Sequence, residues 1–147
     1  MNKFKSFDDI LDYAISREIE AEKFYLKLAD FVEQPEMAKV FSDPASEELE
    51  HKTKLQGIKA GQIRIEKESI GNLGFTDHVK SIEPHAKMSY VDMLVVGMKK
   101  DETSQKLYTD LARLTQKQKL EEIFLQLAQE EADHKLRFEI EYDLMTF

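Results

Sequence analysis

Hydrophobic side chains recur every three or four residues along most of the chain, in four stretches that few glycines or prolines interrupt. Steps of three and four residues return to the same face of an α-helix, so each stretch predicts an amphipathic helix with one buried face. Ser6 and Ser89 are suited to cap the first turns of two of these helices. The predicted helices span residues 6–32, 35–57, 89–115 and 117–145.

The segment between the second and third predicted helices, residues 58–88, lacks this pattern. Most of the chain's glycines fall in or beside it, and we expect a long crossover with one short helix near Asp77–Ile82. His78 and His85 lie here without acidic partners at ligand spacing, so we interpret them as surface or packing residues. This element order predicts an all-α fold: a single-domain four-helix bundle over residues 1–147, with two helical hairpins joined by the crossover.

The second half of the chain repeats chemistry-bearing residues of the first half at a constant offset of 83 residues. The repeat pairs an acid, a tyrosine and a Glu-x-x-His motif in each half: Glu18 with Asp101, Tyr25 with Tyr108, and Glu48–His51 with Glu131–His134. One offset serves both helix pairs, so we expect two similar hairpins related by pseudo-symmetry. A site built from the repeated residues would then be made from two matching halves.

Each predicted buried face carries an acid near its middle, and two of the faces add a histidine three residues later. Burying ionised carboxylates is costly, and no Lys or Arg lies on these faces at that level. Either the acids are protonated, or cations lie among them. Two divalent cations would balance four carboxylates, because neutral imidazoles add no charge. The pattern predicts a dinuclear metal site with six ligands: Glu18, Glu48, His51, Asp101, Glu131 and His134.

A single Glu-x-x-His motif in so acidic a chain is more often part of a solvated helix face than a ligand set. Two copies at the repeat offset, each on an apolar face and each matched by an acid on the neighbouring helix, favour the metal site. We interpret Tyr25 and Tyr108 as core residues whose hydroxyls hydrogen-bond a ligand carboxylate. We expect the acids beside the buried faces to be solvated: Glu47, Glu50, Glu130 and Asp133.

Composition narrows the classes of function. The net charge of −8 argues against a nucleic-acid or anionic-membrane surface, and we expect neither partner. The absence of cysteine excludes disulfides, Fe–S clusters and cysteine nucleophiles within these 147 residues. The longest apolar run, Met93–Met98, is too short to cross a bilayer. The first nine residues lack the apolar core of a signal peptide, so we expect a cytoplasmic protein.

One acid from each of two helices, with Glu-x-x-His from each of the other two, is the ligand pattern of ferritin-like di-iron carboxylate proteins. Within that group the chain resembles the rubrerythrin family in four segments: Ala14–Ala29, Glu47–Gly61, Glu83–Leu94 and Lys106–Ala112. The resemblance covers nearly the whole chain and implies a ferritin-like fold without a rubredoxin domain. It also implies two Fe ions as cofactors, with Mn or Zn as substitutes, and a homodimer.

The resemblance assigns a role to each predicted ligand. It implies that Glu18 and Asp101 are terminal ligands and that Glu48 and Glu131 bridge the two metals. The remaining ligands are one imidazole nitrogen for each metal: His51 and His134. In these roles Glu18, Glu48 and Glu131 would act catalytically through the bound metals, with Tyr25 and Tyr108 supporting the ligand carboxylates.

Three departures from the family pattern stand out. Asp101 replaces the family's glutamate and is one methylene shorter, so we expect weaker binding or binding through water. Ser104 stands where rubrerythrins proper carry an additional glutamate. The missing cysteines mean that no rubredoxin module lies within this sequence. In addition, Pro44 should kink the second helix one turn before Glu48.

The function that the resemblance implies is that of a di-iron oxidoreductase. Such a protein would reduce H₂O₂ or O₂ with electrons from a separate donor protein. One alternative is a ferroxidase that oxidises Fe²⁺ and passes the product on for storage. A second alternative is a non-catalytic metal-binding or interaction module in which the buried acids are relics.

Overall fold

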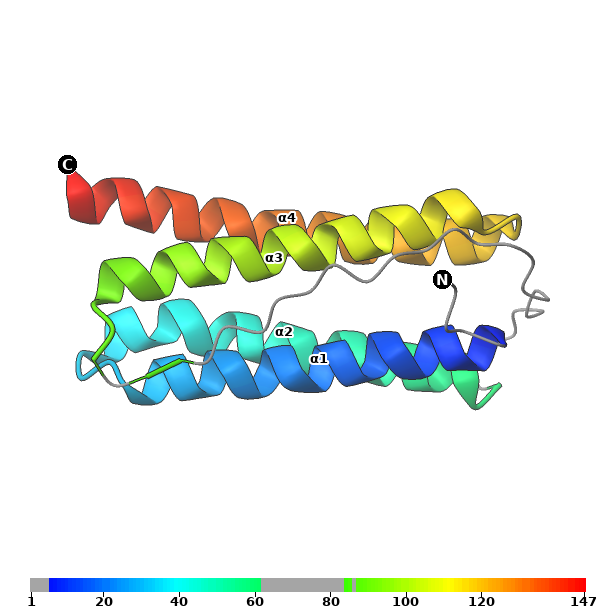
Figure 1. Ribbon diagram of the computed structural model, residues 1–147, viewed down its shortest axis with the longest axis horizontal. Coiled ribbons are helices and arrows are strands. Elements are labelled where there is room, and N and C mark those ends of the chain that lie inside the picture. The colour runs from blue at the N-terminus through cyan, green and yellow to red at the C-terminus, as the bar shows by residue number, and fades with distance from the viewer. Residues whose placement is uncertain (1–5, 62–83, 86) are drawn as a thin grey trace.

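The computed structural model describes residues 6–61, 84–85 and 87–147. These residues form four α-helices and no strand, which confirms the predicted all-α four-helix bundle (Figure 1). The expected short helix near 77–82 and most of the 58–88 crossover lie outside the described residues. The helices, in chain order, are α1 (Phe7–Asp30), α2 (Pro35–Lys59), α3 (Tyr90–Leu114) and α4 (Gln118–Thr146).

Local sequence explains where the helices begin. The Ser6 hydroxyl accepts a hydrogen bond from the Asp9 amide at 3.1 Å, and the Ser89 hydroxyl accepts one from the Asp92 amide at 3.0 Å. Each bond satisfies an amide that the first helical turn leaves unpaired. Pro35 begins α2, where its missing amide hydrogen costs nothing.

The helices form two antiparallel hairpins that dock side by side (Figure 1). The closest packing is within each hairpin, between α1 and α2 and between α3 and α4. The hairpins meet through α1 with α3 and through α2 with α4. Pro44 is buried within α2, which continues as an α-helix on both sides of it. Among the described residues, no helix combines the length and the apolar character that a bilayer crossing needs.

A polar layer divides the bundle core into two apolar clusters. One cluster gathers the start of α1 and the end of α2 with the end of α3 and the start of α4. The other gathers the opposite ends of the same helices. All six predicted ligands lie between the clusters, and none is more than 4% exposed. The bundle therefore places every helix's acid at one level, in an interior shielded from water on both sides.

Gly97 of α3 allows an aromatic ring to pack directly against the helix backbone. A Cβ atom at this position would lie 2.9 Å from Cε2 of Phe138. Phe138 is fully buried, and its ring packs against Tyr25 and Phe41 at centroid distances of 5.7 and 5.6 Å, so the ring has little room to move. We expect Gly97→Ala to lower the free energy of unfolding by up to about 2 kcal/mol in urea titrations. Overpacking costs ~1–3 kcal/mol, and the better helix propensity of alanine returns ~1.

The first half of the chain supplies the control for this substitution. The positions equivalent to Gly97 and Phe138 hold Ala14 and Leu55, which share one apolar cluster. The double variant Gly97→Ala with Phe138→Leu reproduces that pair and should regain part of the lost stability. A single Gly97→Ala variant as stable as the parent protein would show that the ring can give way.

Candidate metal centre

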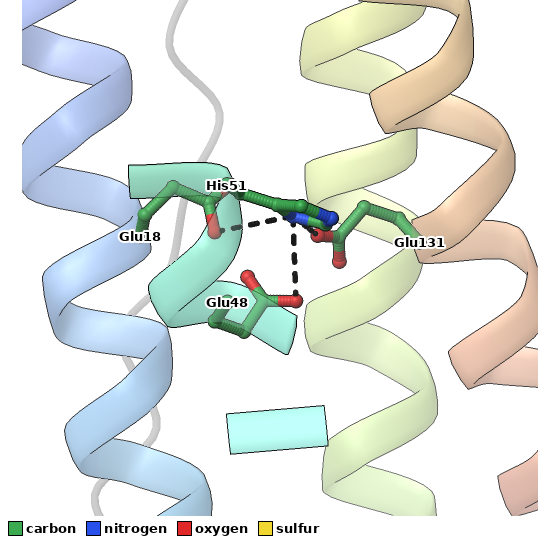
Figure 2. Close-up of side chains that lie close together, drawn as sticks. All are labelled: Glu18, Glu48, His51 and Glu131. Carbon is green, nitrogen blue, oxygen red and sulfur yellow. Dashed lines mark ion pairs between the residues drawn. The ribbon is translucent and has the colours of Figure 1, made fainter. Parts of the chain in front are cut away.

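The polar layer brings together all six predicted ligands, with at least one from each helix. They form two groups in which the potential ligand atoms lie within 4.8 Å of one another. Figure 2 shows the group of Glu18, Glu48, His51 and Glu131. The second group contains Glu48, Asp101, Glu131 and His134. Because Glu48 and Glu131 belong to both groups, they occupy the shared position between two adjacent sites.

Each histidine turns its Nδ1 atom toward the shared carboxylates. His51 Nδ1 lies 3.1 Å from Glu131 Oε1, 3.9 Å from Glu48 Oε1 and 3.5 Å from Glu18 Oε2 (Figure 2). His134 Nδ1 lies 3.2 Å from Glu48 Oε1 and 3.9 Å from Glu131 Oε2. The two rings are nearly parallel, with centroids 6.3 Å apart. The histidines therefore face the centre in matching orientations from opposite hairpins.

Eight buried side-chain nitrogen and oxygen atoms in the described part of the chain lack a well-formed hydrogen bond, and all belong to the six candidate ligands. They are Glu18 Oε2, Asp101 Oδ2, both carboxylate oxygens of Glu48 and of Glu131, and the Nδ1 atoms of His51 and His134. Leaving a buried polar group unsatisfied costs ~1–3 kcal/mol. Carboxylate oxygens and imidazole nitrogens are suitable ligands for Fe, Mn or Zn. The donor set and its unsatisfied atoms therefore fit two divalent cations.

The crowding of acids perturbs their pKa values. Burial, aided by the charge of Glu131, raises the pKa of Glu48 and Asp101 well above the ordinary carboxyl range. Burial acts on Glu18 as well, but contacts with Glu48 and His51 outweigh it and lower its pKa. Burial lowers the pKa of His51, but contacts with Glu131 and Glu18 outweigh this effect and raise its pKa to about 10. Without cations the centre therefore retains protons, which bound cations would displace.

Two buried tyrosines hydrogen-bond the carboxylates of Asp101 and Glu18 across the interface between the hairpins. The Tyr25 hydroxyl of α1 donates to Asp101 Oδ1 of α3 at 2.6 Å. The Tyr108 hydroxyl of α3 donates in the opposite direction, to Glu18 Oε1 of α1. Burial, followed by the charge of the acceptor carboxylate, raises the pKa of both tyrosines well above its usual value, so both hydroxyls keep their protons. Each bond occupies one carboxylate oxygen and leaves the other toward the centre.

Two further glutamates contact the histidines, so the expectation that they are only solvated describes them in part. His51 Nε2 of α2 lies 2.6 Å from Glu130 Oε2 of α4, and His134 Nε2 of α4 contacts Glu47 Oε2 of α2. A neutral histidine that donates its Nε2 hydrogen keeps the lone pair of Nδ1 for a metal. Both glutamates are partly exposed, with side-chain exposures of 39% and 46%.

The other residues named from the sequence lie away from the centre. Glu50 and Asp133 are exposed, and Asp133 accepts a hydrogen bond from Gln129 at 3.0 Å. His85 is exposed, and His78 lies outside the described residues. Within the described ranges, the residues that contact a candidate ligand and were not predicted to do so are Glu47 and Glu130. The repeated Glu-Glu pairs, together with the need of a ligating histidine for an acceptor on its second nitrogen, could have identified them.

Comparisons with known proteins agree with this geometry. The family model for Rubrerythrin matches residues 9–142. This chain belongs to the rubrerythrin family. Among solved structures, the fold is similar to that of "Hypothetical Protein Pfu-1136390-001 From Pyrococcus furiosus", with a TM-score of 0.73 and 24% sequence identity over 92% of this chain and 87% of that one. No curated protein matches the chain.

Membership of the rubrerythrin family implies a di-iron site, for which the six gathered residues are the candidate ligands. Two of the departures noted in the sequence lie at this site. Asp101 is 1% exposed and faces the shared carboxylates despite its shorter side chain. Ser104, one turn further along α3, is also buried and supplies no carboxylate. The candidate set therefore has four acids and two histidines.

This rubrerythrin-family chain has a cavity of about 130 Å³ on the α2–α4 side of the centre. Four acids, both histidines and one arginine line it: Glu47, Glu50, Glu130, Asp133, His51, His134 and Arg137. Glu47 and Glu130, which contact the histidines, thus lie at the boundary between solvent and the buried candidate ligands. The excess of carboxylates makes the cavity attractive to cations.

Neutralising Glu47 or Glu130 should weaken metal binding without removing a candidate ligand. We expect Glu47→Gln or Glu130→Gln to reduce the affinity for Co²⁺ about 10–100-fold in calorimetric titrations, because the histidine loses its charged acceptor. Glu50→Gln is the matched control, since it removes the same charge from the same cavity without touching a histidine. An equal loss in that control would assign the effect to the general field of the cavity.

Proposed function

We propose that this protein is a di-iron oxidoreductase that reduces H₂O₂ or O₂. The observation that carries the proposal is the set of eight potential metal-ligand atoms without a well-formed hydrogen bond. They belong to two four-residue groups that have two carboxylates in common. Membership of the rubrerythrin family supports iron as the metal. A pair of adjacent redox-active metals matches a two-electron reduction of a small oxidant.

The residues of the chain would divide the work of holding this centre. Glu48 and Glu131 would hold both irons, while Glu18 with His51, and Asp101 with His134, would each complete one position. When bound, the irons supply one electron each to the oxidant.

The surroundings of the ligands protect the reaction. Tyr25 holds one carboxylate oxygen of Asp101, and Tyr108 holds one of Glu18. Glu47 and Glu130 orient the imidazoles from the opposite hairpin. The apolar clusters on both sides keep bulk water from the centre, so the electrostatic interactions there are strong.

The reducing equivalents would come from a separate donor protein. These 147 residues contain no cysteine and so cannot bind rubredoxin-type iron. The chain would therefore take up electrons at its surface between turnovers.

Anaerobic stopped-flow mixing of the Fe²⁺-loaded protein with H₂O₂ or O₂ tests the proposal. We expect rapid oxidation of two irons per chain, followed by repeated turnover when a reductant is supplied. Oxidation that continues far beyond two Fe²⁺ per chain without a reductant would instead identify a ferroxidase. Tight metal binding with no reaction toward either oxidant would reduce the protein to a metal-binding module.

A further inference from the structure

We infer that the two halves of the metal centre bind metal unequally, with the position of Glu18 and His51 filling before that of Asp101 and His134. The inference rests on the proposed metal centre and concerns the order in which its positions fill. It follows from the one ligand pair that the repeat does not conserve.

Among the candidate ligands and the residues that contact them through hydrogen bonds, the two halves match in sequence at all positions but one. Histidine stands opposite histidine, each shared glutamate opposite the other, and each supporting tyrosine and outer glutamate opposite its counterpart. Only Glu18 and Asp101 differ, by one methylene group. Both are nearly fully buried, at 2% and 1% exposure, on helices that meet across the hairpin interface. The difference between the halves therefore comes down to how far one carboxylate reaches.

The carboxylates reach their histidines to different extents. Glu18 Oε2 lies 3.5 Å from Nδ1 of His51. Between Asp101 and His134, both described in full, no nitrogen–oxygen contact of 4.0 Å or less is formed, although their ligand atoms remain within 4.8 Å. His134 instead contacts the shared Glu48 and Glu131. The Asp101 half is therefore the wider of the two.

Asp101 is also anchored away from the centre. Its Oδ1 accepts the Tyr25 hydroxyl at 2.6 Å, and the same hydroxyl lies 3.3 Å from the carbonyl oxygen of Gly97. The Tyr25 ring is held between Phe24 and Phe138, at centroid distances of 5.3 and 5.7 Å. A short side chain tied to an immobile phenol has little freedom to follow a cation. Only Oδ2 of Asp101 remains for the metal, and it lies farther from Nδ1 of His134 than Oε2 of Glu18 lies from Nδ1 of His51.

Titration of the chelator-stripped protein with Co²⁺, followed by calorimetry and visible absorption, tests the inference. We expect two binding steps that differ in affinity by about tenfold or more, the loss typical of a change in the groups that orient a ligand. Asp101→Asn should abolish the weaker step and leave the tighter one, whereas Glu18→Gln should abolish the tighter step. Asp101→Glu should bring the two affinities together.

A structural readout identifies the position directly. Crystals grown with one equivalent of Co²⁺ should show anomalous scattering beside His51, with little beside His134. Two equal binding steps, or loss of the tighter step in Asp101→Asn, would overturn the inference and leave the metal centre in place. Absence of any Co²⁺ binding would instead overturn the centre itself, and with it the proposed function.

Discussion

Two equivalents of Co²⁺ or Fe²⁺ should raise the melting temperature of the metal-free protein by on the order of 10 °C or more. The folded state holds eight donor atoms without well-formed hydrogen bonds, whereas the unfolded chain has no assembled site. A ligand that binds only the folded state, at a free concentration of 1,000 times its Kd, contributes about 4 kcal/mol per site. For a domain of this size each kcal/mol corresponds to ~2–4 °C. Differential scanning calorimetry with and without a chelator measures the shift.

The choice of ion provides the control. Mg²⁺ prefers an octahedral shell of oxygen atoms and retains several waters, so a buried site with two imidazole ligands suits it poorly. It should shift the melting temperature far less than Co²⁺ at the same concentration. If stoichiometric Co²⁺ leaves the transition unchanged, the buried acids do not form a metal centre.

Replacing a shared carboxylate should remove both metals at once. Glu131 belongs to both ligand groups and has two unsatisfied oxygens, so Glu131→Gln takes charge and donor capacity from both positions. We expect fewer than one tightly bound metal per chain by elemental analysis. We also expect peroxide reduction to fall by more than about 100-fold, beyond the losses typical of residues that only support a ligand.

Stability separates this effect from misfolding. Glutamine has nearly the same shape as glutamate, and removing the charge of Glu131 relieves its repulsion of Glu48 and Asp101 while weakening its contact with His51. Because these two effects oppose each other, the metal-free Glu131→Gln variant should melt close to the metal-free parent. Glu139→Gln, at an exposed position on the same helix, should change neither metal content nor activity. A metal-free Glu131→Gln variant that melts well below the parent would contradict the expected balance between this repulsion and this contact.

Helical periodicity was enough to predict the bundle and the six candidate ligands that gather in its polar layer. Glu48 and His51 are three residues apart, so one helix face presents both, and the repeat identifies their counterparts Glu131 and His134. The spacing along one helix does not predict the roles of Glu47 and Glu130. Glu47 lies beside the buried face of its own helix, and its partner is His134 of the opposite hairpin. Its role depends on how α2 docks against α4, which the spacing of residues along one helix does not encode.

The reach of Asp101 illustrates a second limit of sequence reasoning. Its shorter side chain could be read from the sequence, and weaker binding was expected. The sequence could not reveal that the Tyr25 hydroxyl anchors the aspartate and also lies beside the backbone carbonyl oxygen of Gly97. Such an anchor is set by packing between α1 and α3, over distances along the chain of more than 70 residues.

In the part of the chain that the structure describes, every hydrogen bond that orients a candidate ligand joins one hairpin to the other. Tyrosines cross between α1 and α3, and histidines cross between α2 and α4. Two identical hairpins from a half-length gene would form the same four bonds when they paired as separate chains. Duplication and fusion of such a gene would leave this repeat, and fusion would free each copy to diverge. Asp101 marks a position where the copies have already ceased to be interchangeable.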